Sequence, residues 1–165
     1  MVVLPILVYP DERLKQVSTP VTEFDAPLQR FLADFEDTMR ASSGCVGLAA
    51  PQVNYFKRIV IVDVSTKPKI AHHGHLVLIN PEIVQRDGET IAREGCLSVP
   101  DFTGNVARAQ HIRVRTHDAA GSVREFDCEG YEARAVQHEM DHLDGLLFLD
   151  RLVNRRDLFR RKVYK

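Results

Sequence analysis

The segment over residues 130–144 constrains the fold more than any other part of the chain, because almost its whole surface must be covered. At about 100° per residue it forms a helix with two covered arcs. One arc is apolar and contains Val136, Met140, Leu143 and Leu147; the other contains Tyr131, Ala135, His138 and His142. The remaining polar arc contains Arg134, Gln137, Asp141 and Asp144, and the head of Arg134 is expected to reach water. A helix covered this extensively lies inside a domain, and Gly145 is placed to end it.

The rest of the hydrophobic pattern predicts an α+β fold, with mostly antiparallel strands around this central C-terminal helix. An earlier helix is expected over residues 25–40, where Asp25 can cap the first turn and apolar residues recur at helical spacing. Strands are predicted over residues 59–64, 76–79, 112–116 and 123–128. No strand–helix–strand rhythm separates these runs, so a parallel sheet is not expected.

Length and composition indicate one domain in a reducing compartment. A chain of 165 residues can form a single core, and we expect residues 1–150 to be one domain. The first apolar run, residues 2–9, lacks the pattern of a signal peptide, and no stretch has the length of a membrane span. Three cysteines are too few for a disulfide framework, so we expect a cytoplasmic protein without a membrane partner.

The last 15 residues differ sharply from the rest in charge. Residues 151–165 carry seven Lys and Arg against one acidic residue, a net charge of +6 that leaves −7 on the other 150 residues. This basic tail is expected to be helical, with Leu152, Phe159 and Val163 near one face. The acidic body is not expected to bind DNA or other polyanions. The tail either packs its apolar side on the domain or binds a polyanion.

Residues 138–142 read His-Glu-Met-Asp-His, an H-E-x-x-H motif on the predicted central helix. Histidines four residues apart lie one above the other, so both imidazoles can bind one metal ion. Glu139 follows the first histidine and can take a proton from a water molecule at that ion without being a ligand. A solvated histidine pair is the alternative, and the covered face argues against it.

The residues alone leave the third protein ligand open, although a catalytic metal site usually has three. No histidine follows His142, and the cysteines lie upstream. Cys128 ends an alternating strand and is more consistent with the core, whereas Cys45 lies in a loop of small residues. Cys96 follows Gly95, whose lack of a side chain lets a ligand approach, and is favoured.

Three histidines, His72, His73 and His75, form another cluster of potential metal ligands. They share one predicted loop with no carboxylate or cysteine near them. We therefore expect no second metal site there.

Two further motifs accompany the histidine motif. Residues 47–52 read Gly-Leu-Ala-Ala-Pro-Gln, residues 94–98 read Glu-Gly-Cys-Leu-Ser, and residues 137–143 read Gln-His-Glu-Met-Asp-His-Leu. In order and approximate spacing these resemble the three signature motifs of the peptide deformylase family. Residues 9–21 and the Leu-Ile-Asn-Pro sequence at residues 78–81 are also similar, so the resemblance runs from about Val3 to Leu152.

The resemblance implies a metal-dependent hydrolase that removes the N-formyl group from the N-terminal formylmethionine of newly made proteins and releases formate. It implies Cys96, His138 and His142 as the metal ligands. A metal-bound water would attack the formyl carbon, with Glu139 as general base and then general acid. The oxyanion donors would be the Gln52 amide and the Leu97 backbone N–H. The peptide path would be lined by Val46, Gly47 and Gly95.

Cofactor and partners follow from the same resemblance. The family usually works with Fe(II), and thiolate and imidazole ligands also suit Zn(II), Ni(II) or Co(II). The partners would be N-formylmethionyl peptides of nascent chains. Because such substrates emerge from the ribosome, ribosomal RNA is the polyanion that the basic tail could contact. The tail lies outside the three motifs, so it is expected to leave the chemistry on a short peptide unaffected.

Some positions depart from the family pattern. Cys45 and Asn54 stand where glycine is common in the family. Arg134 stands where some relatives have an aliphatic residue, and Thr103-Gly104 stands where some relatives have arginine.

Two other functions are possible for such a chain. One alternative is a metallopeptidase or another amidase, which the absence of a downstream third ligand disfavours. The other is an inactive ribosome-binding relative, which intact Glu139, Gln52 and Cys96 disfavour.

Overall fold

The computed structural model describes residues 2–42 and 44–161. Its two α-helices are α1 (Ala26–Ala41) and α2 (Gly130–Leu143). Its strands are β1 (Gly47–Ala49), β2 (Ile59–Val62), β3 (Leu76–Asp87), β4 (Thr90–Cys96), β5 (Val99–Arg108), β6 (His111–His117), β7 (Val123–Glu129) and β8 (Leu158–Arg160). Short 3-10 helices are η1 (Glu12–Lys15), η2 (Ala50–Val53), η3 (Phe148–Arg151) and η4 (Arg155–Asp157).

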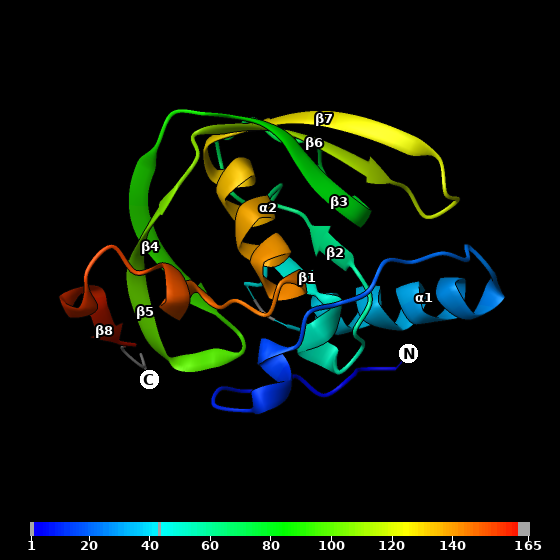
Figure 1. The fold of residues 1–165 in the computed structure, drawn as a ribbon, viewed down its shortest axis with the longest axis horizontal. Helices are drawn as coiled ribbons and strands as arrows, with labels where there is room; N and C mark the ends of the chain where they lie inside the picture. Colours follow the sequence, from blue (N-terminus) through cyan, green and yellow to red (C-terminus); the bar gives the residue numbers. More distant parts are fainter. Residues whose placement is uncertain (1, 43, 162–165) are drawn as a thin grey trace.

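The strands form two antiparallel sheets around α2, which confirms the α+β class. The larger sheet has the order β1-β2-β3-β6-β7 and the smaller the order β4-β5-β8. Every pair of neighbouring strands runs antiparallel. In Figure 1, α2 runs through the middle of the molecule between the two sheets, and α1 lies to one side. β1 and β4 each end their sheet, so each keeps one unpaired edge.

The larger sheet is covered on both faces, which explains the continuous apolar run of β2. Val60 and Val62 face the same core cluster as Val136 of α2. Ile59 and Ile61 face the opposite cluster, together with α1 side chains. Successive strand residues point to opposite faces, so only a strand with cover on both sides is apolar at every position. Each of these side chains contributes about 1.5–3 kcal/mol by leaving water.

Both predicted helices are present. Asp25 caps α1 through its carboxylate, which accepts a hydrogen bond from the Leu28 N–H at 3.1 Å. α2 begins at Gly130, and after it Gly145 takes a left-handed φ of +76°. A side chain at Gly145 would collide with the Lys15 carbonyl, so only glycine fits where η1 passes under the end of α2. Among the described residues, no helix is long and apolar enough to cross a membrane.

The hairpin of β4 and β5 has no counterpart among the predicted strands. The first four residues of β4 are all exposed and show no alternation, so period-2 reasoning finds no signal. Its pairing partner β5 contains Pro100 and Gly104, which also weaken a strand pattern. This hairpin places Cys96 next to α2, at the register break between Glu94 and Cys96.

The prediction of a helical tail is wrong for the residues that the structure describes. The chain forms the short turn η4 and then β8, which pairs with β5 as the third strand of the smaller sheet. The free edge of β5 offers backbone partners that a local helical pattern does not reveal. Val163, part of the predicted apolar face, lies outside the described residues.

Candidate active site

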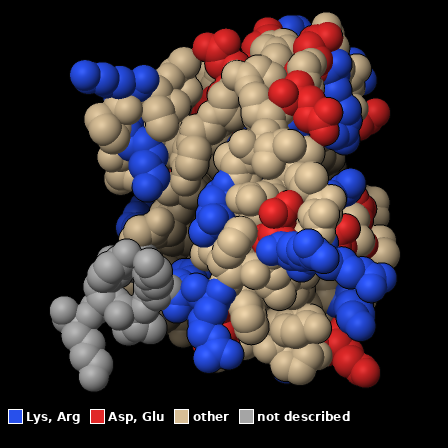
Figure 2. Space-filling model, turned by 90° about the vertical axis from the view of Figure 1, so that its left-hand side faces the viewer, with Lys and Arg blue, Asp and Glu red and all other residues tan. Residues whose placement is uncertain are grey.

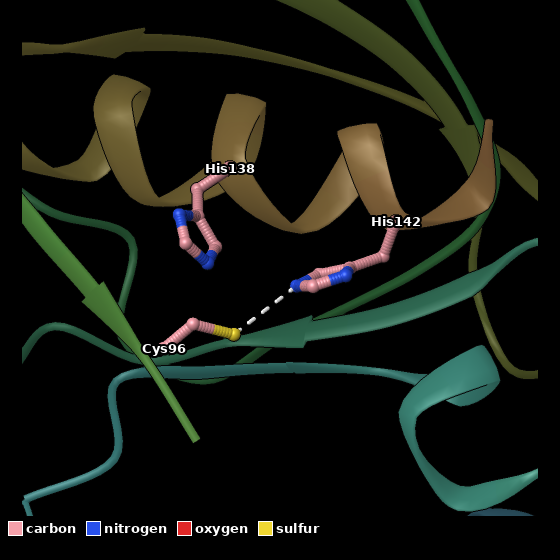
Figure 3. Close-up of side chains that lie close together, drawn as sticks. All are labelled: Cys96, His138 and His142. Carbon is pink, nitrogen blue, oxygen red and sulfur yellow. Dashed lines mark hydrogen bonds between the residues drawn. The ribbon is translucent and has the colours of Figure 1, made fainter. Parts of the chain in front are cut away.

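Cys96 converges with His138 and His142, although it lies more than 40 residues before them in the chain. Figure 3 shows both imidazoles projecting from α2 toward the Cys96 sulfur at the end of β4. One potential ligand atom from each residue lies within 4.8 Å of the others, and all three residues are buried. The Cys96 Sγ is 3.5 Å from Nε2 of His142.

A buried carboxylate fixes the orientation of His138. The Nδ1 of His138 is 2.8 Å from Oε1 of Glu94, so its Nε2 is left to face the cysteine. Glu94 is itself held by the Arg108 guanidinium through two hydrogen bonds, at 2.9 and 3.0 Å. Arg134 donates a further hydrogen bond to Glu94 at 2.6 Å. A carboxylate behind a ligating histidine selects the tautomer that presents the other nitrogen to a metal.

Gln52 approaches the same point from η2. Its side chain is buried, and its Oε1 accepts a hydrogen bond from the Ala49 N–H at 2.9 Å. This contact directs the Nε2 group toward Ser98 Oγ at 3.0 Å and Cys96 Sγ at 3.4 Å. Ser98, which the sequence reasoning did not identify as a site residue, is fully buried and holds the amide in place. Gln52 therefore presents N–H groups beside the Cys96 thiol.

The Glu139 carboxylate lies in the pocket close to the backbone of β1. A Cβ placed on Gly47 would be 2.5 Å from Oε2 of Glu139, so glycine is needed for this approach. The other oxygen, Oε1, is 3.7 Å from Nε2 of His142. That oxygen is buried and has no hydrogen-bond partner among the described residues. A buried polar atom without a partner is costly, which indicates that the site is built to receive one.

Gln52, Cys96, His138 and Glu139 line one cavity of about 430 Å³. The residues expected along the peptide path, Val46, Gly47 and Gly95, lie in its wall, and so does Leu97. His142 lies behind the wall, almost without exposed surface. The structure therefore brings every predicted site residue to one place.

Burial and mutual charge set the ionisation of the site. Burial raises the pKa of Glu139 to about 7. Burial opposes protonation of His138, but the charges of Glu139, Cys96 and Glu94 outweigh it and hold its pKa well above the ordinary value. Burial, with the positive charges of His138 and Arg108, lowers the pKa of His142. A carboxyl group with a pKa near neutrality can both accept and return a proton at working pH.

The polar arc predicted for α2 is largely buried: Asp144 is exposed, but Arg134, Gln137 and Asp141 are covered, and the prediction that the Arg134 head reaches water is wrong. Arg134 is only 7% exposed, and its head does not reach water. Besides Glu94, it donates hydrogen bonds to the carbonyls of Val106 at 3.0 Å and Thr90 at 2.8 Å. Asp141 pairs with Arg108 at 2.5 Å. Helical periodicity groups the polar side chains of α2 on one arc, but it does not reveal that the smaller sheet covers most of this arc and supplies hydrogen-bond partners.

The other two cysteines lie apart from the three converging ligands. Cys128 is 1% exposed in the core, as predicted from its strand. Cys45 lies at the edge of the cavity and donates a hydrogen bond from its thiol to the Gly47 carbonyl at 3.0 Å. Burial raises the pKa of both thiols to about 12, so neither is a thiolate near neutral pH.

The expectation that no carboxylate or cysteine lies near the loop histidines is wrong. The His73 ring is 2.6 Å from Glu132, whose other oxygen accepts a hydrogen bond from the His73 N–H at 2.7 Å. His73, Glu132 and Cys128 bring possible ligand atoms within 4.8 Å of one another. Both oxygens of Glu132 are engaged by His73, so these contacts hold the loop against the start of α2.

The tail also contributes to the cavity, although it was expected to lie outside the site. Arg161 lines the cavity together with Thr103 and Arg93. The pairing of β8 with β5 carries the chain back to this point.

The donor set fits a divalent metal ion. One thiol and two imidazole nitrogens converge, and these atoms suit Zn, Fe, Co or Ni. Glu94 supplies the outer hydrogen bond that ligating histidines usually have. Three protein ligands leave a position open, as in catalytic sites, and the unpartnered oxygen of Glu139 faces the same space.

Comparison with known proteins places the chain in a family. The family model described as polypeptide deformylase matches residues 3–157. A peptide deformylase from Chromobacterium violaceum is 46% identical over 152 residues, which are 92% of this chain and 88% of the relative. One from Thermodesulfovibrio yellowstonii is 42% identical over 163 residues, 98% of this chain and 97% of the relative.

Solved structures agree with the sequence relatives. The crystal structure of a peptide deformylase from Legionella pneumophila superposes with a TM-score of 0.84 at 40% identity, over 94% of this chain and 92% of that one. The crystal structure of a class I type b peptide deformylase from Acinetobacter baumannii with Met-Ala-Ser bound superposes with a TM-score of 0.84 at 36% identity. The match covers 92% of this chain and 100% of that one. The chain therefore belongs to the polypeptide deformylase family of enzymes.

Proposed function

We propose that this chain hydrolyses the formyl amide of N-formylmethionyl peptides and releases formate and a free N-terminus. The observation that carries this proposal is the meeting of Cys96, His138 and His142 with Glu139 and Gln52 around one cavity. A metal-ligand set, a carboxyl group without a partner and an oriented amide donor are the parts that amide hydrolysis needs.

The cavity lies between two free strand edges that suit an extended peptide. β1, with Gly47, ends the larger sheet, and β4, with Gly95, ends the smaller sheet. Both glycines line the cavity. An extended peptide gains affinity by adding its backbone hydrogen bonds to such an edge. The Acinetobacter baumannii relative, with Met-Ala-Ser bound, supports a peptide as the occupant here too.

Cys96, His138 and His142 would hold one divalent metal ion. When bound, such an ion acts as a Lewis acid that acidifies water and polarises a carbonyl group. We propose Fe(II) in the cell, with Zn(II), Ni(II) or Co(II) able to replace it, because thiolate and imidazole suit all four. The ligands bind as thiolate and neutral imidazoles, so metal binding releases protons.

Glu139 carries the proton. We assign to it the removal of a proton from the attacking water and its return to the departing amine, since its pKa of about 7 suits both directions. The Gln52 amide, held by Ala49 and Ser98, would donate to the negative oxygen that develops on the formyl group. Leu97 lines the cavity, and its backbone N–H would be the second donor.

Domain limits and partners complete the proposal. Residues 1–150 form the catalytic domain, and the chain after them completes the smaller sheet through β8. The substrates are nascent chains in the cytoplasm. The basic tail is proposed to contact the ribosome, which needs only exposed arginines and no helix.

One experiment tests this function directly. Formate release from formyl-Met-Ala is measured under anaerobic conditions, together with the metal content of the same sample. The matched substrate acetyl-Met-Ala differs by one methyl group and should react far more slowly. Absence of formate from a sample with stoichiometric metal would overturn the proposal. Cleavage of the Met-Ala bond instead would favour the metallopeptidase alternative.

A further inference from the structure

Two arginines, Arg93 of β4 and Arg161 of the tail, lie at the exposed face of β4 beside the cavity. Arg93 and Arg161 both line the cavity, together with Gly95. A Cβ placed on Gly95 would be 2.5 Å from Nη2 of Arg161, so the guanidinium lies directly over this glycine. Arg161 fills the space that a side chain at Gly95 would otherwise occupy.

The tail is held in this position by several independent contacts. Thr103 pairs with Phe159 in the sheet, and the Arg161 N–H donates a hydrogen bond to the Asp101 carbonyl at 2.8 Å. The Arg93 guanidinium lies over the Phe159 ring, 3.8 Å from its centroid. A side chain at Gly104 would collide with Leu152, so this glycine lets the tail pack closely.

Among the described residues, these two guanidinium groups have no acidic partner, unlike Arg134 of the same cavity wall. Within residues 2–42 and 44–161, the Arg161 side chain makes no hydrogen bond or ion pair, and the side chain of Arg93 donates one hydrogen bond, to the Asn105 amide oxygen at 3.3 Å. Arg134, by contrast, is bound to Glu94. Figure 2 shows Lys and Arg side chains gathered on this side of the molecule near its C-terminal end. Two unpaired cations beside a binding cavity favour an anionic ligand.

The strand geometry indicates which part of a substrate would meet them. Along β4, Arg93 and Gly95 point to the exposed face, whereas Glu94 and Cys96 point to the buried face with the metal ligands. A peptide paired to the free edge of β4 also alternates its side chains between two faces. Side chains on the exposed face therefore pass Arg93 and Arg161.

We propose that Arg161 and Arg93 form a cationic subsite that recognises a carboxylate on one of the two residues after formylmethionine. The proposal rests on the proposed function, because it specifies the substrate class of the same cavity. Guanidinium groups bind carboxylates through paired hydrogen bonds, and the Arg161 side chain forms none with the part of the chain that the structure describes. Both groups are solvent-exposed, so the expected preference is about two- to fivefold.

The test compares peptides that differ only in one charge. The substrates are formyl-Met-X-Ala-amide and formyl-Met-Ala-X-amide, with Asp, Asn or Lys at X, because the amide removes the terminal carboxylate. In one of the two peptide series, kcat/KM for the Asp peptide should exceed that for the Asn peptide about two- to fivefold, chiefly because its KM is lower. Arg161→Gln should bring this ratio close to 1, and Arg161→Glu should favour Lys over Asp. Arg161→Lys should keep part of the ratio.

Arg160→Gln is the matched control, because Arg160 is its exposed neighbour on the tail and does not line the cavity. It should keep the Asp-to-Asn ratio of the wild type. A wild-type ratio of 1 in both series would overturn the subsite, as would an unchanged ratio in Arg161→Gln or Arg161→Glu. Failure of the wild type to release formate from the Asn peptides would instead contradict the proposed function.

Discussion

At the scale of single residues, the assignment of Glu139 separates proton transfer from metal binding. Its carboxylate lies beside the ligands, but is not one of the three converging groups. Glu139→Gln keeps the size of the side chain and removes the proton acceptor. We expect kcat to fall by about 10²–10⁴-fold or more while one metal ion per chain remains bound. Loss of the metal in this variant, or nearly full activity, would show that the role is assigned wrongly.

The three cysteines provide a second test at this scale. Cys96→Ser should abolish tight metal binding, whereas Cys45→Ser and Cys128→Ser should retain it, because neither thiol belongs to the group that contains His138 and His142. Cobalt substitution gives the measurement, since the thiolate-to-metal absorption band should disappear only with Cys96. A band that disappears with Cys45 would mean a different ligand set. Cys128→Ser is expected to cost about 1–3 kcal/mol of stability, because it buries a hydroxyl group.

At the scale of elements, α2 depends on a buried charge network that runs into the smaller sheet. Arg108 is 4% exposed and pairs with both Glu94 and Asp141. Arg108→Met would leave these carboxylates short of a partner, and we expect a loss of about 3–5 kcal/mol in the free energy of unfolding by urea. Arg113 is the control, because its pairs with Glu125 and Asp127 are exposed. Arg113→Met should cost about 1 kcal/mol or less. Equal losses would show that the buried network is unimportant.

The same elements show how far the sequence can be interpreted. The hydrophobic pattern and the caps predicted α1, α2 and the apolar strand β2, because these signals are local. The ligand positions on α2 were also local, since residues four apart on a helix must lie together. The glycine before Cys96 only favoured it as the third ligand, and the resemblance was needed to assign it, because nothing near it in sequence shows that β4 ends beside α2. The surroundings of Arg134 and the pairing of β8 could not be predicted, since both depend on the hairpin of β4 and β5, which has no periodic signal.

At the scale of the whole molecule, the tail divides into two parts with different surroundings. Phe159 packs under the Arg93 guanidinium of β4, and Arg161 lines the cavity. Arg155, Arg156 and Arg160 are exposed. The tail is strongly basic on an otherwise acidic chain. The exposed arginines are therefore the ones available to a large polyanion such as ribosomal RNA.

This division allows a test of ribosome binding that leaves the cavity intact. Changing Arg155, Arg156 and Arg160 together to Gln should weaken co-sedimentation with ribosomes at low salt. The slope of log affinity against log salt should become shallower by about 0.7 to 0.9 for each phosphate that the variant no longer neutralises. The kcat/KM on formyl-Met-Ala should not change, because none of the three lines the cavity. A control variant removes the same charge elsewhere, at the exposed residues Arg30, Arg115 and Arg124. If both variants weaken ribosome binding equally, binding depends only on net charge and not on the tail. If neither weakens it, the tail arginines are solvated and do not contact the ribosome.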